Sequence, residues 1–337
     1  MNQLNFAAIG TGGIFKTVQF MIQRNKRAKL ACIVDINEES AKKWSEKLGT
    51  PYCCSTDEFY EDYCKDIDAV YIATPHFTHT SMMDDAIDNN INIFIEKPLT
   101  TKLDDAIRIV NKAEKEGVKI GVDFQNRYNP QAVNMARAVQ DGHLGKIMYG
   151  TVNVPWKRTK NYYESSPWRG KLETAGGGTL MTHAIHFIDI LIWALGTPVS
   201  VSGKIATRRH DIEVEDVGMG LIEFESGAIA QVLSSAANDP GAGTHISIFG
   251  EKGNILFRGS IFSQVKWQRV KRKKYPLDAK GLLSYGKIVD AFISYVMRNK
   301  PFNATGKESL KITAVIDAIY ESSRTGKEVS IDTSIFQ

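Results

Sequence analysis

The chain has 337 residues, of which 43% are hydrophobic and 24% are charged. This balance is ordinary for a globular protein and excludes a largely disordered chain, and the length is enough for two domains. Its 42 basic and 38 acidic residues leave a formal charge of +4. Such a charge attracts nucleic acid only weakly, so we expect no nucleic-acid partner. The one basic run, residues 271–274, is more typical of a solvated loop than of a nucleic-acid patch.

The start of the chain and its cysteines indicate the compartment. No basic leader and no long apolar segment precede the first strand-like pattern, so we expect no signal peptide, no membrane span and no membrane partner. Cys32, Cys53, Cys54 and Cys64 lack the paired spacing of a zinc site and are too few for a disulfide scaffold. Reduced thiols in a cytoplasmic protein fit this pattern best.

Residues 1–123 alternate short apolar runs with helical patterns. Strands are predicted at residues 4–9, 29–36, 69–73, 92–95 and 119–123, and helices at residues 14–24, 38–48, 79–88 and 102–116. Strands that are apolar throughout and separated by helices predict a parallel sheet covered on both faces. We therefore expect an α/β, doubly wound Rossmann domain that binds a dinucleotide.

The pattern changes over residues 124–337. A helix at residues 130–140 precedes strand-like runs at residues 147–154, 199–205, 217–224, 228–235, 245–249 and 254–257, with helices at residues 180–195, 282–297 and 309–323. Glycine-containing turns join several runs, as in antiparallel hairpins. This predicts an α+β domain with an open, largely antiparallel sheet that binds the substrate. One sheet face is left to bury, so we expect a homodimer or homotetramer that uses residues 217–224 and 228–235.

A glycine-rich loop follows the first predicted strand. In Gly10-Thr11-Gly12-Gly13-Ile14-Phe15, Gly10 permits a tight turn and Gly12 lets the backbone approach a pyrophosphate at a helix amino end. Phe15, at the third small position, weakens the match. Asp35 ends the second strand about 20 residues on and can bind ribose hydroxyls, which favours NAD over NADP; alternatively it caps a turn. The predicted cofactor contacts here are Gly10, Gly12, Gly13, Ile14, Phe15 and Asp35.

A second charged motif, Glu96-Lys97-Pro98, ends the strand at residues 92–95. The carboxyl ends of parallel strands face the ligand crevice, and Pro98 favours an extended Lys97. A lysine there could stabilise a developing alkoxide on a substrate. An equally good interpretation is a surface lysine paired with Glu96.

A third motif combines a triple glycine with histidines. Residues 176–178 lead into an apolar helix that carries His183, His186 and Asp189 at three-residue spacing, which predicts a shared face. Histidine suits proton transfer with an alcohol, and Asp189 could fix its tautomer. His183 is more typical of a structural core histidine. No carboxylate–histidine set of familiar spacing accompanies the pair, so we expect no metal.

Together these segments resemble the glucose–fructose oxidoreductase / inositol dehydrogenase (Gfo/Idh/MocA) family over nearly the whole chain. The resemblance rests on the glycine loop, residues 73–75 with His79, Glu96-Lys97-Pro98, residues 124–130, the glycine run with His186 and Asp189, and residues 320–326. It implies that Thr74, Pro75, His79, Glu96 and Lys97 contact NAD. It also implies hydride transfer between the nicotinamide and a hydroxyl-bearing carbon of a sugar, assisted by Lys97, with His186 handling the hydroxyl proton.

The resemblance also bears on the substrate. Inositol-dehydrogenase-like members place an aspartate four residues before the histidine, whereas this chain has Thr182, which makes inositol a less fitting substrate. Residues 161–170 look similar to amino-sugar and nucleotide-sugar oxidoreductases, in which aromatic rings stack on sugar and an arginine pairs with a carboxylate or phosphate. Ordinary loop packing explains the aromatics equally well, and Arg127 could be an interdomain ion pair. The predicted substrate contacts are Arg127, Tyr163, Trp168, Arg169, Thr182, His183 and Asp189.

Two other functions stay open. A non-catalytic regulator that senses a dinucleotide or sugar would need no acid–base pair, so Lys97 and His186 argue against it. A glycosidase that uses tightly held NAD for transient oxidation is also implied by the resemblance. The sequence does not separate it from a dehydrogenase that acts on a sugar, amino sugar or nucleotide sugar.

Overall fold

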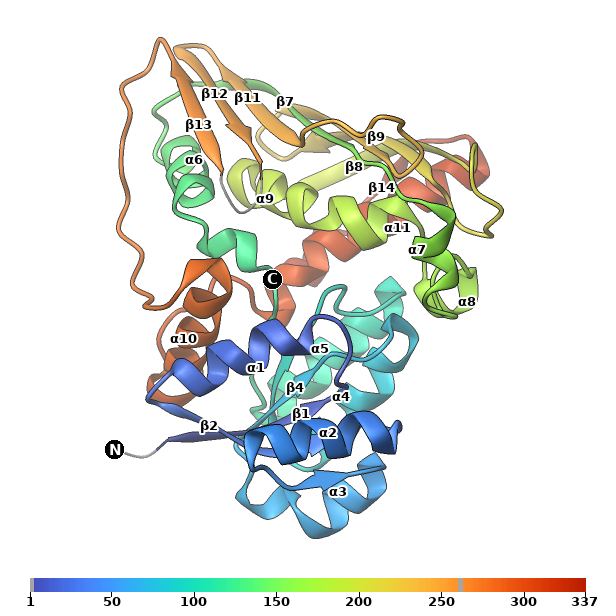
Figure 1. The fold of residues 1–337 in the computed structure, drawn as a ribbon. Coiled ribbons are helices and arrows are strands. Elements are labelled where there is room, and N and C mark those ends of the chain that lie inside the picture. Colours follow the sequence, from blue (N-terminus) through green and yellow to red (C-terminus); the bar gives the residue numbers. More distant parts are fainter. Residues whose placement is uncertain (1–2, 260–262) are drawn as a thin grey trace. The chain divides into compact units, whose positions relative to one another are not determined.

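The computed structural model describes residues 3–259 and 263–337 (Figure 1). The chain divides into two compact units, each built from several segments. The first contains Met1–Thr100, Asp104–Tyr128 and Asp278–Ser309, and the second contains Thr101–Leu103, Asn129–Leu277 and Leu310–Gln337. A single division at residue 123 therefore differs from the structure, because a late segment returns to the first unit.

The first unit is built on a parallel sheet of order β3-β2-β1-β4-β5-β6. Its strands are β1 (Leu4–Ile9), β2 (Ala28–Val34), β3 (Tyr52–Cys53), β4 (Ala69–Ile72), β5 (Asn92–Ile95) and β6 (Ile120–Val122). Every pairing in this sheet is parallel. The strand order reverses between β1 and β4, which is the switch point at which doubly wound sheets bind ligands. The predicted Rossmann fold is confirmed.

Helices cover this sheet. They are α1 (Phe15–Arg24), α2 (Glu38–Leu48), α3 (Thr56–Asp62), α4 (His79–Asp88), α5 (Leu103–Glu116) and α10 (Leu283–Arg298). The returning helix α10 packs on the strands through Phe292, whose ring lies 5.0 Å from that of Phe94 and 6.1 Å from that of Phe6. All three side chains are fully buried. Burial of aromatic surface against the sheet is the reason that α10 belongs to this unit.

The second unit is built on an eight-stranded sheet of order β13-β12-β11-β7-β10-β9-β8-β14. Its strands are β7 (Ile147–Pro155), β8 (Pro198–Ala206), β9 (Val217–Phe224), β10 (Ile229–Ser235), β11 (His245–Gly250), β12 (Gly253–Arg258), β13 (Gln264–Gln268) and β14 (Val329–Ser330). All neighbours are antiparallel except β7 and β10, which pair in parallel. The expected open, largely antiparallel sheet is therefore confirmed, with one parallel pair at its centre.

The helices of this unit lie on one face of the sheet (Figure 1). They include α6 (Pro130–Gln140), α9 (Ile185–Leu195) and α11 (Gly306–Thr325), with the short α7 (Lys160–Glu164) and α8 (Leu172–Ala175) nearby in sequence. Glycines in the strands let the helices approach closely: a Cβ at Gly220 would lie 2.8 Å from Ile319 of α11. The helix predicted at residues 180–195 begins instead with a π-helical turn, Leu180–Ala184, before α9.

Two sequence expectations concern surfaces. The basic run at residues 271–274 is exposed and lacks regular secondary structure, as predicted. The helical stretch Leu172–Leu195 is long and apolar enough to cross a membrane by length and composition. However, 83% of its most apolar window is buried inside the structure. This is the environment of a core helix in a globular unit.

Candidate active site

The glycine loop joins β1 to α1 in the first unit. Gly10 has a positive φ of 93°, and a Cβ there would lie 2.7 Å from the carbonyl oxygen of Ala73. Glycine is therefore required at this position. Space is open beside Gly12 and Gly13, which are exposed at the amino end of α1. Backbone N–H groups at such a helix end can hold the pyrophosphate of a dinucleotide, so the loop fits NAD.

Phe15 does not disturb this loop. Its ring is fully buried and meets Trp44 of α2 edge to face, with 5.0 Å between ring centroids. The bulk that weakened the sequence match therefore fills the space between α1 and α2. In place of the third small residue of the motif, this chain has an aromatic side chain that packs between the two helices.

Asp35 lies just beyond β2 and supports the glycine loop. Its Oδ2 accepts a hydrogen bond from the backbone N–H of Thr11 (2.7 Å), and its Oδ1 accepts one from the N–H of Asn37 (2.9 Å). The turn-capping interpretation is therefore part of its role. The half-buried carboxylate is still placed beside the loop, where a cofactor ribose would lie in a Rossmann domain.

His79 holds together the loops that follow β4 and β5. It is fully buried, and its Nδ1 lies 2.7 Å from the carbonyl oxygen of Pro98 and its Nε2 3.2 Å from that of Thr74. Burial lowers the pKa of His79, which favours the neutral ring. His79 is thus more deeply buried than Thr74, Pro75 and Lys97, which lie in the two loops and are half-buried. Its contact with NAD stays a prediction.

A second carboxyl group lies beside the Glu96-Lys97 motif. Asp123 follows β6, and its N–H donates to the carbonyl of Ile95 (2.7 Å) on the neighbouring strand. Glu96 accepts a hydrogen bond from the buried Tyr71 hydroxyl (2.8 Å). Burial, and then repulsion from Glu96, raises the pKa of Asp123 well above its ordinary range, whereas the positive charge of Lys97 opposes that rise. Lys97 therefore interacts electrostatically with both carboxyl groups, and of the two it is Asp123 whose protonated form is more strongly favoured.

The triple glycine of the second unit is required by close packing. A Cβ at Gly178 would overlap the carbonyl of Glu215, and one at Gly177 would overlap the hydroxyl of Tyr320. The buried Glu215 carboxylate accepts hydrogen bonds from the N–H groups of Gly178 (2.7 Å) and Leu180 (3.0 Å) and from the Tyr320 hydroxyl (3.1 Å). Burial raises the pKa of Glu215 to about 7. Glu215 therefore anchors the turn that leads into the histidine-bearing helix.

The histidine-bearing helix presents its predicted residues in two different ways. Thr182 and His186 are half-buried, whereas His183 is 4% exposed and Asp189 is fully buried. His183 lies in the π-helical turn at residues 180–184, whereas His186 and Asp189 lie in α9, so the three residues do not share one regular helix. His186 is thus the accessible histidine of a helix that is otherwise almost entirely core.

His183 holds an arginine that the sequence did not single out. Its Nε2 accepts a hydrogen bond from the Nε–H of Arg158 (2.8 Å), and its Nδ1 lies 2.9 Å from the hydroxyl of Thr182. Thr182 in turn donates to the carbonyl of Gly178 (2.7 Å). The available signal was a charged residue three positions after the end of β7, with Trp156 just before it and Tyr162 and Tyr163 shortly after it.

The segment at residues 161–170 forms an aromatic cluster. The ring of Tyr163 lies 5.1 Å from that of Tyr162 and 4.9 Å from that of His210. The Arg169 guanidinium lies 4.4 Å from the Tyr162 ring and 5.6 Å from the Trp168 ring. The predicted substrate residues Tyr163, Trp168 and Arg169 therefore come together, close to His183 through Tyr162.

Arg127 lies in the interior of the first unit. It is 1% exposed, donates to the carbonyl of Asn303, and its Nη1 is 3.4 Å from the Glu308 carboxylate. Both partners belong to the same unit as Arg127, so the ion pair is not interdomain. These contacts explain a buried arginine without a ligand, and its substrate contact stays a prediction.

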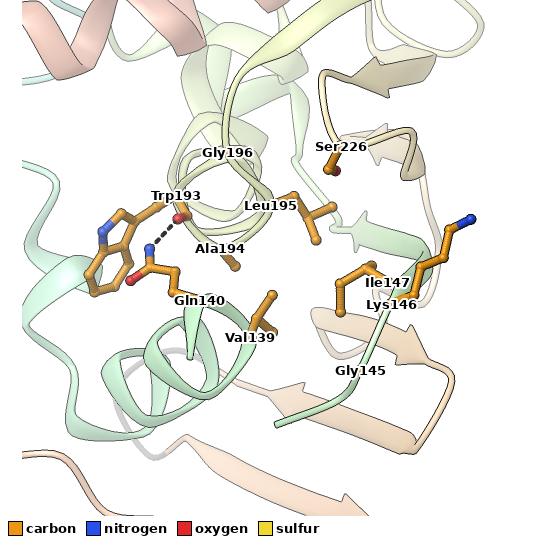
Figure 2. Close-up of a pocket in the computed structure, with 10 residues that line it drawn as sticks. All are labelled: Val139, Gln140, Gly145, Lys146, Ile147, Trp193, Ala194, Leu195, Gly196 and Ser226. Carbon is orange, nitrogen blue, oxygen red and sulfur yellow. Dashed lines mark hydrogen bonds between the residues drawn. The ribbon is translucent and has the colours of Figure 1, made fainter. Parts of the chain in front are cut away.

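The second unit also contains a hollow of about 430 Å³ (Figure 2). It is lined by Val139, Gln140, Gly145, Lys146, Ile147, Trp193, Ala194, Leu195, Gly196 and Ser226. Gln140 Nε2 already donates to the carbonyl of Trp193 (2.7 Å). The hollow lies at the carboxyl end of α9, away from His186 at its amino end, and it includes none of the predicted site residues.

These features define the class of protein: a Rossmann unit with a dinucleotide loop, joined to an α+β unit that presents a histidine from a core helix. Comparisons with known proteins agree. Residues 4–124 match the oxidoreductase family model with an NAD-binding Rossmann fold, and residues 133–256 match the GFO/IDH/MocA C-terminal domain. The chain belongs to the Gfo/Idh/MocA oxidoreductase family, as its motifs indicated.

Individual relatives cover most of the chain. It is 30% identical to scyllo-inositol 2-dehydrogenase (NAD(+)) of Bacillus subtilis, over 78% of this chain and 76% of that one. It is 26% identical to the uncharacterized oxidoreductase YrbE of the same organism, over 98% and 97%. The crystal structure of the WlbA dehydrogenase from Bordetella pertussis in complex with NADH and UDP-GlcNAcA superimposes with a TM-score of 0.89 at 29% identity, covering 98% of this chain and 99% of that one.

These findings establish an oxidoreductase with an NAD-binding Rossmann fold, whose homologues are dehydrogenases that act on CH–OH groups of sugars. The relatives do not share one cofactor: D-xylose 1-dehydrogenase (NADP(+)) 2 of Haloferax volcanii is 27% identical over 97% of this chain and 99% of that one. The choice between NAD and NADP in this chain therefore depends on its own residues.

Proposed function

We propose that the protein transfers a hydride between NAD and a hydroxyl-bearing carbon of a sugar, amino sugar or nucleotide sugar. The observation that carries this proposal is the half-buried His186 at the start of an otherwise buried helix. A histidine in such a place is accessible to a substrate and is held rigidly by the core around it. The structural relative that contains NADH and UDP-GlcNAcA supports a nucleotide-sugar substrate.

The proposed mechanism divides the work between two residues. A carbinol carbon gives up hydride readily only as its hydroxyl proton is removed, so one group must accept that proton. His186 is the proposed base, because a neutral imidazole can accept a proton near pH 7. Bound NAD supplies the hydride acceptor. Lys97 is the proposed electrostatic partner, since its positive charge stabilises negative charge on the substrate oxygen.

The surroundings of Lys97 favour this division. Glu96 and Asp123 both interact electrostatically with Lys97, and burial disfavours two negative charges in one place. If Asp123 keeps its proton, the Glu96 carboxylate and the Lys97 ammonium are the two charges that remain. These two charges balance each other, so Lys97 can stay positively charged at the strand ends. The reverse assignment, with Lys97 as the base and His186 as the partner, uses the same two groups.

Replacement of either residue tests the proposal. We expect Lys97→Met and His186→Ala to lower turnover by on the order of a hundred-fold or more, with NADH affinity nearly unchanged. Steady-state kinetics on a sugar panel and fluorescence titration of NADH measure the two quantities. Lys115→Met, at an exposed lysine, is the matched control. Turnover within about three-fold of the parent in both variants would place the catalytic centre elsewhere.

The same panel separates the alternatives. A dehydrogenase releases its cofactor and accumulates NADH in proportion to oxidised sugar. An NAD-dependent glycosidase cleaves glycosides without net NADH. A sensing regulator binds NADH and sugar but turns over neither.

We further propose a cytoplasmic homodimer or homotetramer that buries the sheet face opposite to α9 and α11. Exposed apolar residues on that face support the proposal: Met219 and Leu221 of β9 and Ile229 of β10 are 48%, 61% and 57% exposed. Such a patch on a sheet favours association. The four cysteines are free thiols, which suits a reducing compartment. We propose no nucleic-acid and no membrane partner, in keeping with the near balance of charges.

A further inference from the structure

Arg158 is held between aromatic rings in the second unit. It follows β7, and its guanidinium carbon lies 4.8 Å from the ring centroid of Trp156 and 4.9 Å from that of Tyr162. Trp156 is itself fixed by a hydrogen bond from its Nε1–H to the Thr244 hydroxyl (2.7 Å). An arginine stacked in this way keeps its charge and its planar fork of donors in a defined orientation.

The hydrogen bonds of His183 fix the position of Arg158 further. The Nε–H of Arg158 can only donate, so the Nε2 of His183 must accept and carries no proton. The proton of the neutral ring is then on Nδ1 and points to the Thr182 hydroxyl, which itself donates to Gly178. Each donor in this series therefore meets an acceptor. The series ties Arg158 to the turn that leads into the helix of His186.

Neither Arg158 nor its neighbour Arg169 makes an ion pair with a carboxylate within residues 3–259 and 263–337. Asp239 pairs with Lys157 and Arg209 instead. The Nη1 of Arg158 reaches only the carbonyl of Lys157, at 3.4 Å, while its Nε is held by His183.

Both guanidinium groups lie against one ring. The carbon of Arg158 is 4.9 Å and that of Arg169 is 4.4 Å from the centroid of Tyr162. Two positive charges beside one ring disfavour each other, and a bound anion would relieve this repulsion. An oxyanion is the group that guanidinium forks bind best, often through two hydrogen bonds.

We propose that Arg158, together with Arg169, binds an anionic group of the substrate, a carboxylate or a phosphate, and that His183 is the positioning residue for Arg158. This inference rests on the proposed function, because it concerns the substrate of the same site. It selects an acidic or phosphorylated sugar, such as a uronic acid or a nucleoside diphosphate sugar, over a neutral one. Thr182 and His183 then act through Arg158 rather than on the sugar.

Binding measurements on the NADH-loaded protein test the role of Arg158. The probes are UDP, glucuronate and glucose, measured by calorimetry. We expect Arg158→Gln to lower the affinity for whichever anionic probe binds the parent protein by ten-fold or more, which is the scale of a lost charge-assisted hydrogen bond. The affinity for NADH should stay unchanged. Arg158→Lys keeps the charge but loses the fork, so it should recover only part of the affinity. Arg324→Gln, at an exposed arginine paired with Glu321, is the control.

A pair of variants tests His183 as a positioning residue. In His183→Gln the amide oxygen can still accept from Arg158, whereas His183→Leu cannot. We expect His183→Leu to raise the KM of the anionic substrate about as much as Arg158→Gln, and His183→Gln to retain most of the affinity. The double variant Arg158→Gln/His183→Leu should add no further loss, because both changes remove one interaction. Equal losses in His183→Gln and His183→Leu would overturn the positioning role.

The probes also identify the source of the anion. Binding of UDP alone indicates a phosphate, binding of glucuronate alone indicates a carboxylate, and both results support the site. Equal binding of glucose and the anions, or the same loss for all three in Arg158→Gln, would overturn the proposal. If no sugar is oxidised and UDP or glucuronate still requires Arg158, the proposed function fails while the anion site stands.

Discussion

Asp35 is the residue on which cofactor choice depends. Its carboxylate is fixed at the end of β2 by the N–H groups of Thr11 and Asn37, beside the glycine loop. A fixed negative charge there repels a 2′-phosphate and accepts hydrogen bonds from ribose hydroxyls. We therefore expect NADH to bind at least about ten-fold more tightly than NADPH, which corresponds to roughly 1.4 kcal/mol.

Titration of cofactor fluorescence measures both affinities. Asp35→Asn removes the negative charge at nearly constant side-chain size. It should reduce the difference in affinity between NADH and NADPH, mainly because NADPH binds more tightly. Asp88→Asn, at an exposed side chain on α4, provides the control. Equal affinities for NADH and NADPH in the parent protein would contradict the assignment.

At the scale of elements, the turn before the histidine-bearing helix depends on Glu215. The folded-state pKa of Glu215 is raised to about 7 from the ordinary value of 4.5, because the carboxyl group is buried. A raised pKa in an acid means that the folded state binds its proton more tightly than the unfolded state does. This contribution to stability is fully present below about pH 4.5 and is lost as the pH rises through 7.

Glu215→Gln should remove this dependence. For the parent, we expect the contribution of Glu215 to lower the Tm by on the order of 5 °C between pH 5 and pH 8, and the variant to show a correspondingly flatter profile. Thermal melts across this range measure the difference. Glu213→Gln, which changes a neighbouring carboxylate that accepts from the N–H of Leu172, is the control. Parallel pH profiles for parent and Glu215→Gln would show that Glu215 is ionised throughout.

At the scale of the whole molecule, the exposed face of the second sheet predicts association. Leu221 and Ile229 project from neighbouring strands on the face opposite to the helices, and Tyr149 of β7 pairs in register with Ile229. Light scattering at micromolar concentration should show a dimer or tetramer. Leu221→Lys should shift it toward the monomer, whereas Leu282→Lys, at an exposed leucine of the first unit, should not. A monomeric parent protein would refute the expectation.

Local patterns in the sequence determined the fold class and indicated the candidate site residues. Apolar runs separated by helical periods predicted the parallel sheet, because a strand buried on both faces must be apolar throughout. Gly10, Asp35 and Lys97 were recognisable because each lies within two residues of the end of a strand, and the ends of strands in a parallel sheet meet at one edge. His186 was recognisable as a polar residue in an apolar helix.

Only the tertiary structure decided the partners of these residues. Three pairs join segments that are more than 20 residues apart in the chain: Asp123 with Glu96, Glu215 with Gly178, and Arg158 with His183. Nothing local in the sequence specifies such pairs. The return of residues 278–309 to the first unit is of the same kind, since it depends on Phe292 meeting the sheet. A sequence pattern predicts which side chains are buried. Which of the buried side chains contact one another depends on the long-range packing of the folded chain.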